Sequence, residues 1–311
     1  MPDIVVMFFL LGVLAGLAKS DLKVPKAAYD TLSILLMLTL GLKGGLALHG
    51  QVSWNLLPEV ITVILLGIAI PLALYPLLRK LVLLNEANSA SIAAHYGSAS
   101  AGTFAVALAF AEANNLSIAP QTTLYLVLLE LPAIVVAILL YKKATGNGGS
   151  MKGIWHEALT SRGVVLLTGG VVIGYLYGPE ASKDIAPLFL GAFKALLALF
   201  LLEMGVCASQ HLRPFPSQHW RLISFALIAP FALALVGITA GIALDLPQGS
   251  VLILAALTAS ASYIAAPAAI QAAIKEADVG LAIVAALGVT FPLNVLVGIP
   301  VYHQVMLSLM A

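Results

Sequence analysis

Charged residues are scarce in this chain. Only 9% of its 311 residues are Asp, Glu, Lys or Arg, whereas soluble domains carry about 25%. A soluble protein of this length needs a charged surface, which 15 basic and 14 acidic residues cannot supply. With 61% hydrophobic residues and a mean hydropathy of +1.05, the composition predicts an integral membrane protein in contact with a lipid bilayer.

Cysteine is almost absent, and so are the usual signatures of catalysis. The single Cys207 excludes an internal disulfide, and the lack of a Cys/His cluster argues against a structural zinc site. A net charge of +1 without basic runs gives no reason to expect a nucleic-acid partner. No Ser-His-Asp order, zinc-protease spacing or phosphate loop is present, so we expect a protein that is not an enzyme.

Apolar stretches long enough to span a membrane make up most of the chain. We mark ten of them, at 4–18, 30–48, 56–78, 89–111, 120–141, 163–177, 185–207, 220–244, 249–274 and 279–305. The longest polar segment is glycine-rich and separates five stretches from five. The sequence therefore predicts a first five-helix unit at 1–141, a cytoplasmic linker at 142–162 and a second five-helix unit at 163–311.

The basic residues indicate how the chain is oriented. Twelve of the fifteen lie in connections after odd-numbered stretches, and only Lys183 follows an even-numbered one. By the positive-inside tendency the odd connections are cytoplasmic, which places both termini outside. We expect the first stretch to be retained rather than cleaved as a signal peptide, because Asp3 occupies the position where such a peptide needs a basic start.

Short motifs recur between the two units at similar offsets. Gly12 and Gly16 recur as Gly170 and Gly174 at an offset of 158, Ser-Ala-Ser at 98–100 recurs at 260–262 at 162, and Leu-Pro at 131–132 corresponds to Phe-Pro at 291–292 at 160. Because each unit has five helices, the second must enter the membrane in the opposite orientation. The predicted fold is an all-α polytopic membrane protein of about ten transmembrane helices in two inverted repeats.

Two of the apolar stretches contain polar interruptions. One reads Gly-Ser-Ala-Ser-Ala-Gly-Thr at 97–103, and the other reads Ser-Ala-Ser at 260–262 and ends at Pro267. At membrane depth such interruptions are tolerated where they line a cavity or are buried in protein. The matched pair predicts two broken helices that cross at mid-membrane and form a transporter's binding site. Close helix packing through small residues is the alternative.

The predicted breaks offer groups for both an anion and a cation. Half-helix N-termini present free N–H groups that suit a small anion, while unwound carbonyls and hydroxyls suit Na⁺. Glu130 lies deep in the fifth stretch and is the best candidate carboxylate for Na⁺ or a proton, unless it lies near an interface. Thr290 and Asn294 flank Pro292 at the corresponding place in the second unit and are further candidate Na⁺ ligands.

Other polar residues within the stretches have alternative interpretations. Lys43 and Glu203 occupy similar places in the second and seventh stretches and could pair across the pseudo-symmetry. Alternatively Lys43 extends to the nearer membrane surface and Glu203 serves subunit packing. His95 and Tyr96 could line a vestibule, although a single histidine beside a polar break is more often only hydrogen-bonded.

Four segments carry a family resemblance, at 40–45, 97–103, 130–133 and 259–262 with Pro267. Through these segments the chain resembles the sodium-dependent bicarbonate transporters best known from cyanobacteria, over nearly its whole length apart from a shorter middle connection. The resemblance implies a core domain and a gate domain, a homotrimer in the bacterial inner (plasma) membrane, and a PII-like regulatory protein on the cytoplasmic face. It also implies that bicarbonate and Na⁺ bind where the two broken helices cross.

The resemblance also assigns roles to individual positions. Substrate contacts would come from Ser98, Ser100, Gly102, Thr103, Ser260 and Ser262, and Na⁺ contacts from Ser98, Glu130, Ser260 and Ser262. Thr290 and Asn294 are added as candidate Na⁺ ligands because of their position beside Pro292. Two positions depart from the family pattern, since Tyr263 stands where an acid is expected and Glu130 where Asp is usual. The loss of an acid near the cation would weaken coupling to sodium.

The expected function is Na⁺-coupled symport of a small anion, with bicarbonate as the first candidate and Na⁺ as the coupling ion. An inward sodium gradient can drive an anion uphill, and Na⁺ that binds first offsets the cost of placing an anion in a low-dielectric site. One alternative is transport of another small organic anion, or an exchanger that uses Glu130 for protons. A channel or a non-transporting regulatory membrane scaffold is the other.

Overall fold

The computed structural model describes residues 4–22, 24–51, 53–146, 159–160, 162–211 and 219–310. Across these ranges every regular element is a helix and none is a strand. The first half holds α1 (Ile4–Leu17), α2 (Lys26–Leu48), α3 (Leu57–Leu77), α4 (Glu86–Gly97), α5 (Ala101–Ala113) and α6 (Leu124–Thr145). The second half holds α8 (Arg162–Ala181), α9 (Ala186–His211), α10 (Trp220–Ala243), α11 (Gln248–Thr258), α12 (Ala265–Ala273), α13 (Val279–Ile283), α14 (Phe291–Leu293) and α15 (Ile299–Met310).

Each of the ten predicted apolar stretches is largely helical. In the described part of the chain, seven helices are long and apolar enough to cross a membrane, whereas α1 and α11 are shorter. The two stretches predicted to be interrupted are each divided, the fourth into α4 and α5 and the ninth into α11 and α12. The chain is therefore an all-helical, multi-pass membrane protein, and the count of ten inverted crossings stays a prediction.

The end of α6 differs from the sequence prediction, whereas the end of the sixth apolar stretch agrees with it. Helix α6 continues through Thr145, into the segment predicted as a linker at 142–162, and residues 147–158 lie outside the described part. Within α8 the backbone leaves the helical region at Gly178, with φ 65° and ψ 178°. This break confirms the predicted end of the sixth stretch, because Pro179 follows directly and cannot donate to the preceding turn.

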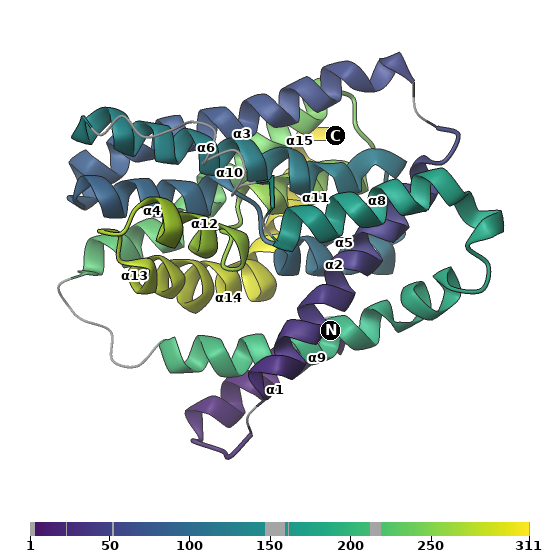
Figure 1. The fold of residues 1–311 in the computed structure, drawn as a ribbon, viewed down its shortest axis with the longest axis horizontal. Coiled ribbons are helices and arrows are strands. Elements are labelled where there is room, and N and C mark those ends of the chain that lie inside the picture. Colours follow the sequence, from purple (N-terminus) through teal and green to yellow (C-terminus); the bar gives the residue numbers. More distant parts are fainter. Residues whose placement is uncertain are drawn as a thin grey trace.

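The helices form two groups. In the first, α1 packs against α9, α2 packs along α8, and α2 also contacts α9. In the second, α3 packs with α4 and α6, while α10 packs with α11 and α15, and α5 contacts α11. Figure 1 shows α1 crossing α9 at the lower edge of the view, apart from α3 and α6 at the upper edge. We call the first group, α1, α2, α8 and α9, the four-helix group.

Small residues make the two closest seams of the four-helix group. A Cβ atom added to Gly12 of α1 would lie 3.1 Å from the Cα of Gly205 in α9, and one added to Gly41 of α2 would lie 3.0 Å from the Cα of Gly170 in α8. The backbones therefore approach closely, as in other membrane helix pairs with small residues at the interface. Gly12 and Gly170, which recur in the sequence at an offset of 158, thus each lie in a close seam between two helices.

The last helical segment, 279–310, is irregular around Pro292. Two π-helical turns, η5 (Val284–Thr290) and η6 (Asn294–Gly298), flank the short helix α14. Proline lacks an N–H and its ring clashes with the carbonyl four residues earlier, so the widened turns accommodate it without ending the helix. The turns place Thr290 and Asn294 in the protein interior, where both are fully buried.

The α2–α8 seam gives a direct test of this packing. We expect Gly170→Leu to destabilise the protein by about 1–3 kcal/mol or more, because the added side chain has no space against Gly41. Gly169→Leu is the matched control, since an added Cβ at Gly169 meets no atom within 4 Å. Melting temperatures in detergent measure both, and an equal loss in the two variants would contradict the seam.

Candidate functional site

Both interruptions leave the helical conformation at serine-rich segments. Helix α4 ends at Gly97 and α5 begins at Ala101, with Ser98 and Ser100 in extended conformations. Helix α11 ends at Thr258, and α12 begins only at Ala265. The prediction that these two helices are broken is confirmed, and their crossing at mid-membrane stays a prediction. All the serines of both breaks are buried.

The two breaks are hydrogen-bonded to each other. The N–H of Ser100 donates to Oγ of Ser260 at 2.9 Å, and the N–H of Ser262 donates to the carbonyl oxygen of His95 at 2.7 Å. The Ser260 hydroxyl in turn donates to the carbonyl of Leu257 at 2.7 Å. Backbone groups that the breaks release from helical pairing therefore find partners inside the protein, as they must at membrane depth.

Corresponding serines hydrogen-bond the first turns of the two half-helices that follow the breaks. Oγ of Ser100 accepts a hydrogen bond from the N–H of Thr103 at 3.1 Å, and Oγ of Ser262 accepts one from the N–H of Ala266 at 3.3 Å. The first is an N-capping interaction, which fixes where α5 begins. The second pairs an early N–H of α12 from two residues before its N-cap position, Ile264. The N-termini of α5 and α12, with their partial positive charge, thus begin at the junction of the two breaks.

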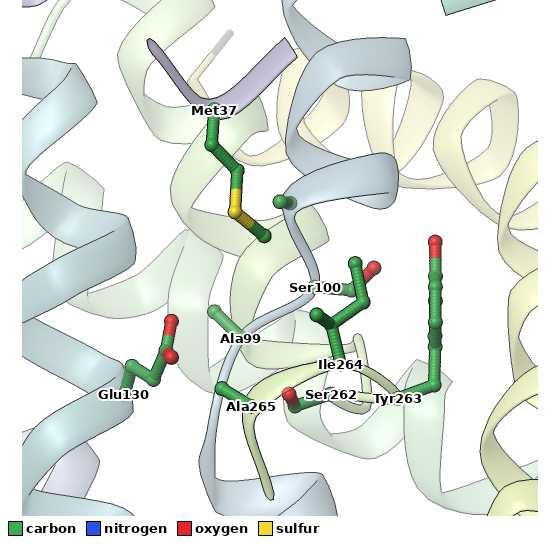
Figure 2. A pocket seen from close by; sticks show the side chains of 9 residues that line it. Met37, Ala99, Ser100, Glu130, Ser262, Tyr263, Ile264 and Ala265 are labelled. Carbon is green, nitrogen blue, oxygen red and sulfur yellow. The ribbon is translucent and has the colours of Figure 1, made fainter. Parts of the chain in front are cut away.

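A small cavity lies at this junction. Ser100, Ser262 and Glu130 provide its polar lining, and the remaining lining residues are Met37, Ala99, Ala101, Tyr263, Ile264 and Ala265. Its volume is about 10 Å³, close to the space that one ordered water needs. Figure 2 shows Glu130 on one side, the two serines on the other, and Met37 reaching in from α2. The cavity thus brings together three of the predicted site residues from three separate segments.

Several polar atoms around this junction lack a hydrogen-bond partner among the described residues. They include Oγ of Ser98, Oγ1 of Thr103 and Oε1 of Glu130, and these three side chains are buried. A buried polar atom without a partner costs about 1–3 kcal/mol, so native proteins rarely keep one without a reason such as a ligand or an ion. These three atoms are suited to contact a polar ligand.

Of the residues that the structure describes, Glu130 is the one carboxylate that lines the cavity. Its side chain is 4% exposed, and no described lysine or arginine forms an ion pair with it. An ionised carboxylate without a partner is costly in a low-dielectric interior, so Glu130 must be protonated or accompanied by a cation. Helix α8 passes close to it, because a Cβ at Gly163 would lie 3.1 Å from its Oε1.

An aromatic cluster covers the start of α5. A methyl group at Gly102 would overlap the hydroxyl of Tyr263 and lie 3.1 and 3.2 Å from the rings of Phe200 and Phe291. The rings of Tyr263 and Phe291 meet edge to face, with centroids 5.3 Å apart. Gly102 therefore leaves space for aromatic side chains rather than lining the cavity itself. Sequence reasoning missed Phe200 and Phe291, because a phenylalanine in an apolar stretch carries no signal of its own.

Thr290 and Asn294 do not line the cavity. Thr290 hydrogen-bonds the hydroxyl of Tyr96 at 2.6 Å and donates to the carbonyl of Ala226 at 2.9 Å. The amide of Asn294 donates to the carbonyl of Ala259 at 2.9 Å, next to the second break. These contacts make Asn294 a positioning residue for that break, and a role of either residue as a Na⁺ ligand stays a prediction.

The hypothesis that Lys43 pairs with Glu203 is wrong. Lys43 forms an ion pair with Glu112 at the end of α5 and lies 5.3 Å from the centre of the Phe193 ring. Glu203 instead accepts a hydrogen bond from Sγ of Cys207 at 3.4 Å. Sequence spacing placed Lys43 and Glu203 at similar depths, but their partners depend on how the helices are rotated.

His95 is buried and takes part in the hydrogen bonding around the first break. Its Nδ1 lies 2.7 Å from the carbonyl oxygen of Ser91, and its own carbonyl accepts from Ser262. Neither His95 nor Tyr96 lines the cavity. The simpler expectation, a hydrogen-bonded histidine beside a polar break, is therefore confirmed.

A comparison with known protein families matches nearly the whole chain. The family model described as the Na⁺-dependent bicarbonate transporter superfamily matches residues 4–307. No curated protein matches the chain.

The bond between the breaks can be tested by removing its acceptor. We expect Ser260→Ala to lower the stability by about 1–3 kcal/mol, because the N–H of Ser100 is left buried without a partner. Ser33→Ala is the control, since Ser33 is equally buried and its Oγ has no hydrogen-bond partner among the described residues. If both variants melt at the same temperature in detergent, the bond does not hold the breaks together.

Proposed function

The chain belongs to the Na⁺-dependent bicarbonate transporter superfamily, and on this premise we propose that it carries a small anion together with Na⁺, with bicarbonate as the first candidate. The observation that carries the proposal is the meeting of two broken helices at a buried cavity between Ser100, Ser262 and Glu130. Membership in a family of transporters also implies that the chain is not an enzyme.

The anion would be held at the N-terminus of α5. The first amides of a helix have no partner within it and carry the positive end of its dipole, which favours negative charge. The unpartnered hydroxyls of Ser98 and Thr103 lie on either side of this helix start in the sequence and can donate to oxygen atoms. Bicarbonate, with three oxygens and one negative charge, matches such a set of donors.

The cation would be held between Glu130 and the serines of the breaks. Na⁺ is coordinated in transporters of this kind by unwound carbonyls and half-helix ends, and a carboxylate adds the charge that compensates its desolvation. Glu130 and Ser262 line the same cavity, and the extended backbone of the breaks passes beside it. A bound Na⁺ would then lower the cost of bringing an anion into the same low-dielectric region, which is the physical basis of coupling.

The four-helix group would act as the gate, and the remaining helices as the core that contains the breaks. Met37 of α2 is the residue of this group that lines the cavity. The ion pair between Lys43 of α2 and Glu112 of α5 joins the two groups at another point. Alternating access requires such contacts to break and re-form as one group moves against the other. Met37 would therefore be one of the gate contacts that change during transport.

The inverted repeat is supported by the way the helices pair. If α1 and α2 correspond to α8 and α9, a pseudo-two-fold axis exchanges the α1–α9 contact with the α2–α8 contact. Gly12 with Gly205 and Gly170 with Gly41 are then equivalent pairs. We therefore propose ten crossings in two inverted repeats, with both termini outside the bacterial inner membrane. The homotrimer and the PII-like regulator that the family resemblance implies stay predictions.

Proton coupling, or transport of another small organic anion, is the second candidate. It is favoured by one observation, that Tyr263 lines the cavity at the place where the family resemblance leads us to expect an acid. Glu130 then remains as the only cavity carboxylate and could exchange a proton in place of Na⁺. The two candidates differ in whether uptake follows the sodium gradient or the pH gradient.

Uptake into proteoliposomes distinguishes these functions. We expect saturable uptake of radiolabelled bicarbonate under an inward Na⁺ gradient, and little uptake when K⁺ or choline replaces Na⁺. The double variant Ser100→Ala/Ser262→Ala should lose at least nine-tenths of this uptake, because it removes both cavity hydroxyls and their hydrogen bonds to the first turns of α5 and α12. Ser33→Ala/Ser308→Ala, which changes serines outside the cavity, should transport normally. Uptake indifferent to Na⁺ contradicts the symport, and melting temperatures show whether a loss reflects unfolding.

Glu130 provides a separate test of the coupling ion. Glu130→Gln keeps the shape of the side chain but removes its negative charge, so we expect the Na⁺ concentration for half-maximal uptake to rise at least tenfold. Glu180→Gln changes an exposed glutamate outside the cavity and is the control. An unchanged sodium dependence in Glu130→Gln would exclude it as a Na⁺ ligand. Uptake that follows an inward proton gradient, and is lost in Glu130→Gln, would favour the proton-coupled candidate.

A further inference from the structure

A long apolar groove lies on the outside of the helices that contain the breaks. It runs between the end of α3, with the π-helical turn η2 (Leu78–Val82), and the first half of α10. Its volume is about 710 Å³. Leucines of α3 and η2 and small residues of α10, such as Ala229 and Ala232, line it. The groove is separate from the cavity between the breaks, since the two share no lining residue.

One end of the groove is basic. Lys80 and Arg221 line it there, beside the exposed ring of Trp220. Within the described residues neither cation forms an ion pair, whereas the neighbouring Arg79 pairs with Glu86. The guanidinium of Arg221 lies over the Trp220 ring, 5.5 Å from its centre. Among the described residues none that lines the groove is acidic, so its charged end is complementary to an anion.

The dimensions of the groove match a lipid chain. From Trp220 to Leu233 the helix α10 extends about 20 Å at 1.5 Å per residue, which exceeds half of the roughly 30 Å hydrocarbon thickness of a bilayer. Tryptophan is enriched at the membrane–water interface, which is where lipid phosphates lie. The basic end belongs to connections predicted to be cytoplasmic, where anionic lipids attract lysine and arginine. The groove therefore has a basic end for a lipid phosphate, a tryptophan at the interface, and an apolar length for an acyl chain, in the same order as these parts occur in a phospholipid.

We propose that this groove binds an anionic phospholipid, with its phosphate at Lys80 and Arg221 and an acyl chain along α10 and the end of α3. A zwitterionic lipid also fits the apolar part, but it brings a positive charge to a site that already has two. The proposal therefore concerns preference for anionic lipid, and it does not depend on which anion the protein transports.

Trp220 is itself a reporter for the test. In a Trp54→Phe/Trp155→Phe background it is the only tryptophan of the chain, and brominated lipids in the groove quench its fluorescence. The full-length protein is reconstituted in phosphatidylcholine with increasing fractions of brominated phosphatidylglycerol, or of brominated phosphatidylcholine for comparison. The quenching curves give the relative affinity of the groove for the two lipids.

We expect the groove to prefer phosphatidylglycerol over phosphatidylcholine severalfold. Lys80→Gln and Arg221→Gln should each reduce this preference by roughly fivefold at most, because one basic residue near an anionic surface contributes about that factor to binding. Lys142→Gln/Lys143→Gln removes two basic residues from the end of α6, outside the groove, and should keep the preference. Unchanged quenching by brominated phosphatidylcholine shows that the variants remain folded and inserted.

Three results would overturn the proposal. Equal quenching by the two lipids in the unsubstituted background would show that the groove has no preference for an anionic headgroup. The absence of quenching by either lipid would show that protein covers the groove. A loss of quenching when soluble glycerol phosphate is added would show that the basic end binds a free phosphate and not a lipid.

Discussion

Pairing of backbone groups at membrane depth is the constraint on which the site depends. Interrupting a helix in hydrocarbon exposes N–H and C=O groups that water cannot reach. The two breaks resolve this together, since Ser100 donates to Ser260 and Ser262 donates to His95. Neither break could be buried in this way without the other. The requirement that brings them together also places two helix N-termini, two hydroxyls and the Glu130 carboxylate at one point.

In the proposed transport cycle the same arrangement would link binding to movement. The breaks belong to helices that pack with α6 and α10, whereas the cavity is completed by Met37 from the four-helix group. A ligand in the cavity therefore touches both groups and can change how they fit together. Close glycine seams hold α1 to α9 and α2 to α8, so the four-helix group is suited to move as a unit against the core in the proposed transport cycle.

Local composition was enough to predict the membrane class, the helical stretches and the two breaks, because serine and glycine clusters weaken a helix and are tolerated at membrane depth only where protein or a cavity surrounds them. It was also enough to select Ser100, Ser262 and Glu130, which the structure brings to one cavity. It could not predict the partner of Lys43, the packing of Phe200 and Phe291 over Gly102, or the hydrogen-bond partners of Thr290 and Asn294. These contacts join segments that are distant in the sequence, and they depend on how the helices are rotated against one another.

Binding of radioactive Na⁺ to the purified protein, measured with and without bicarbonate, tests the central claim most directly. If both ions occupy the junction of the two breaks, each must raise the affinity of the protein for the other by the same factor. The account predicts saturable Na⁺ binding that bicarbonate strengthens, and a loss of this effect when both cavity serines are replaced by alanine. Saturable Na⁺ binding that bicarbonate leaves unchanged would contradict a shared site at the crossing of the broken helices.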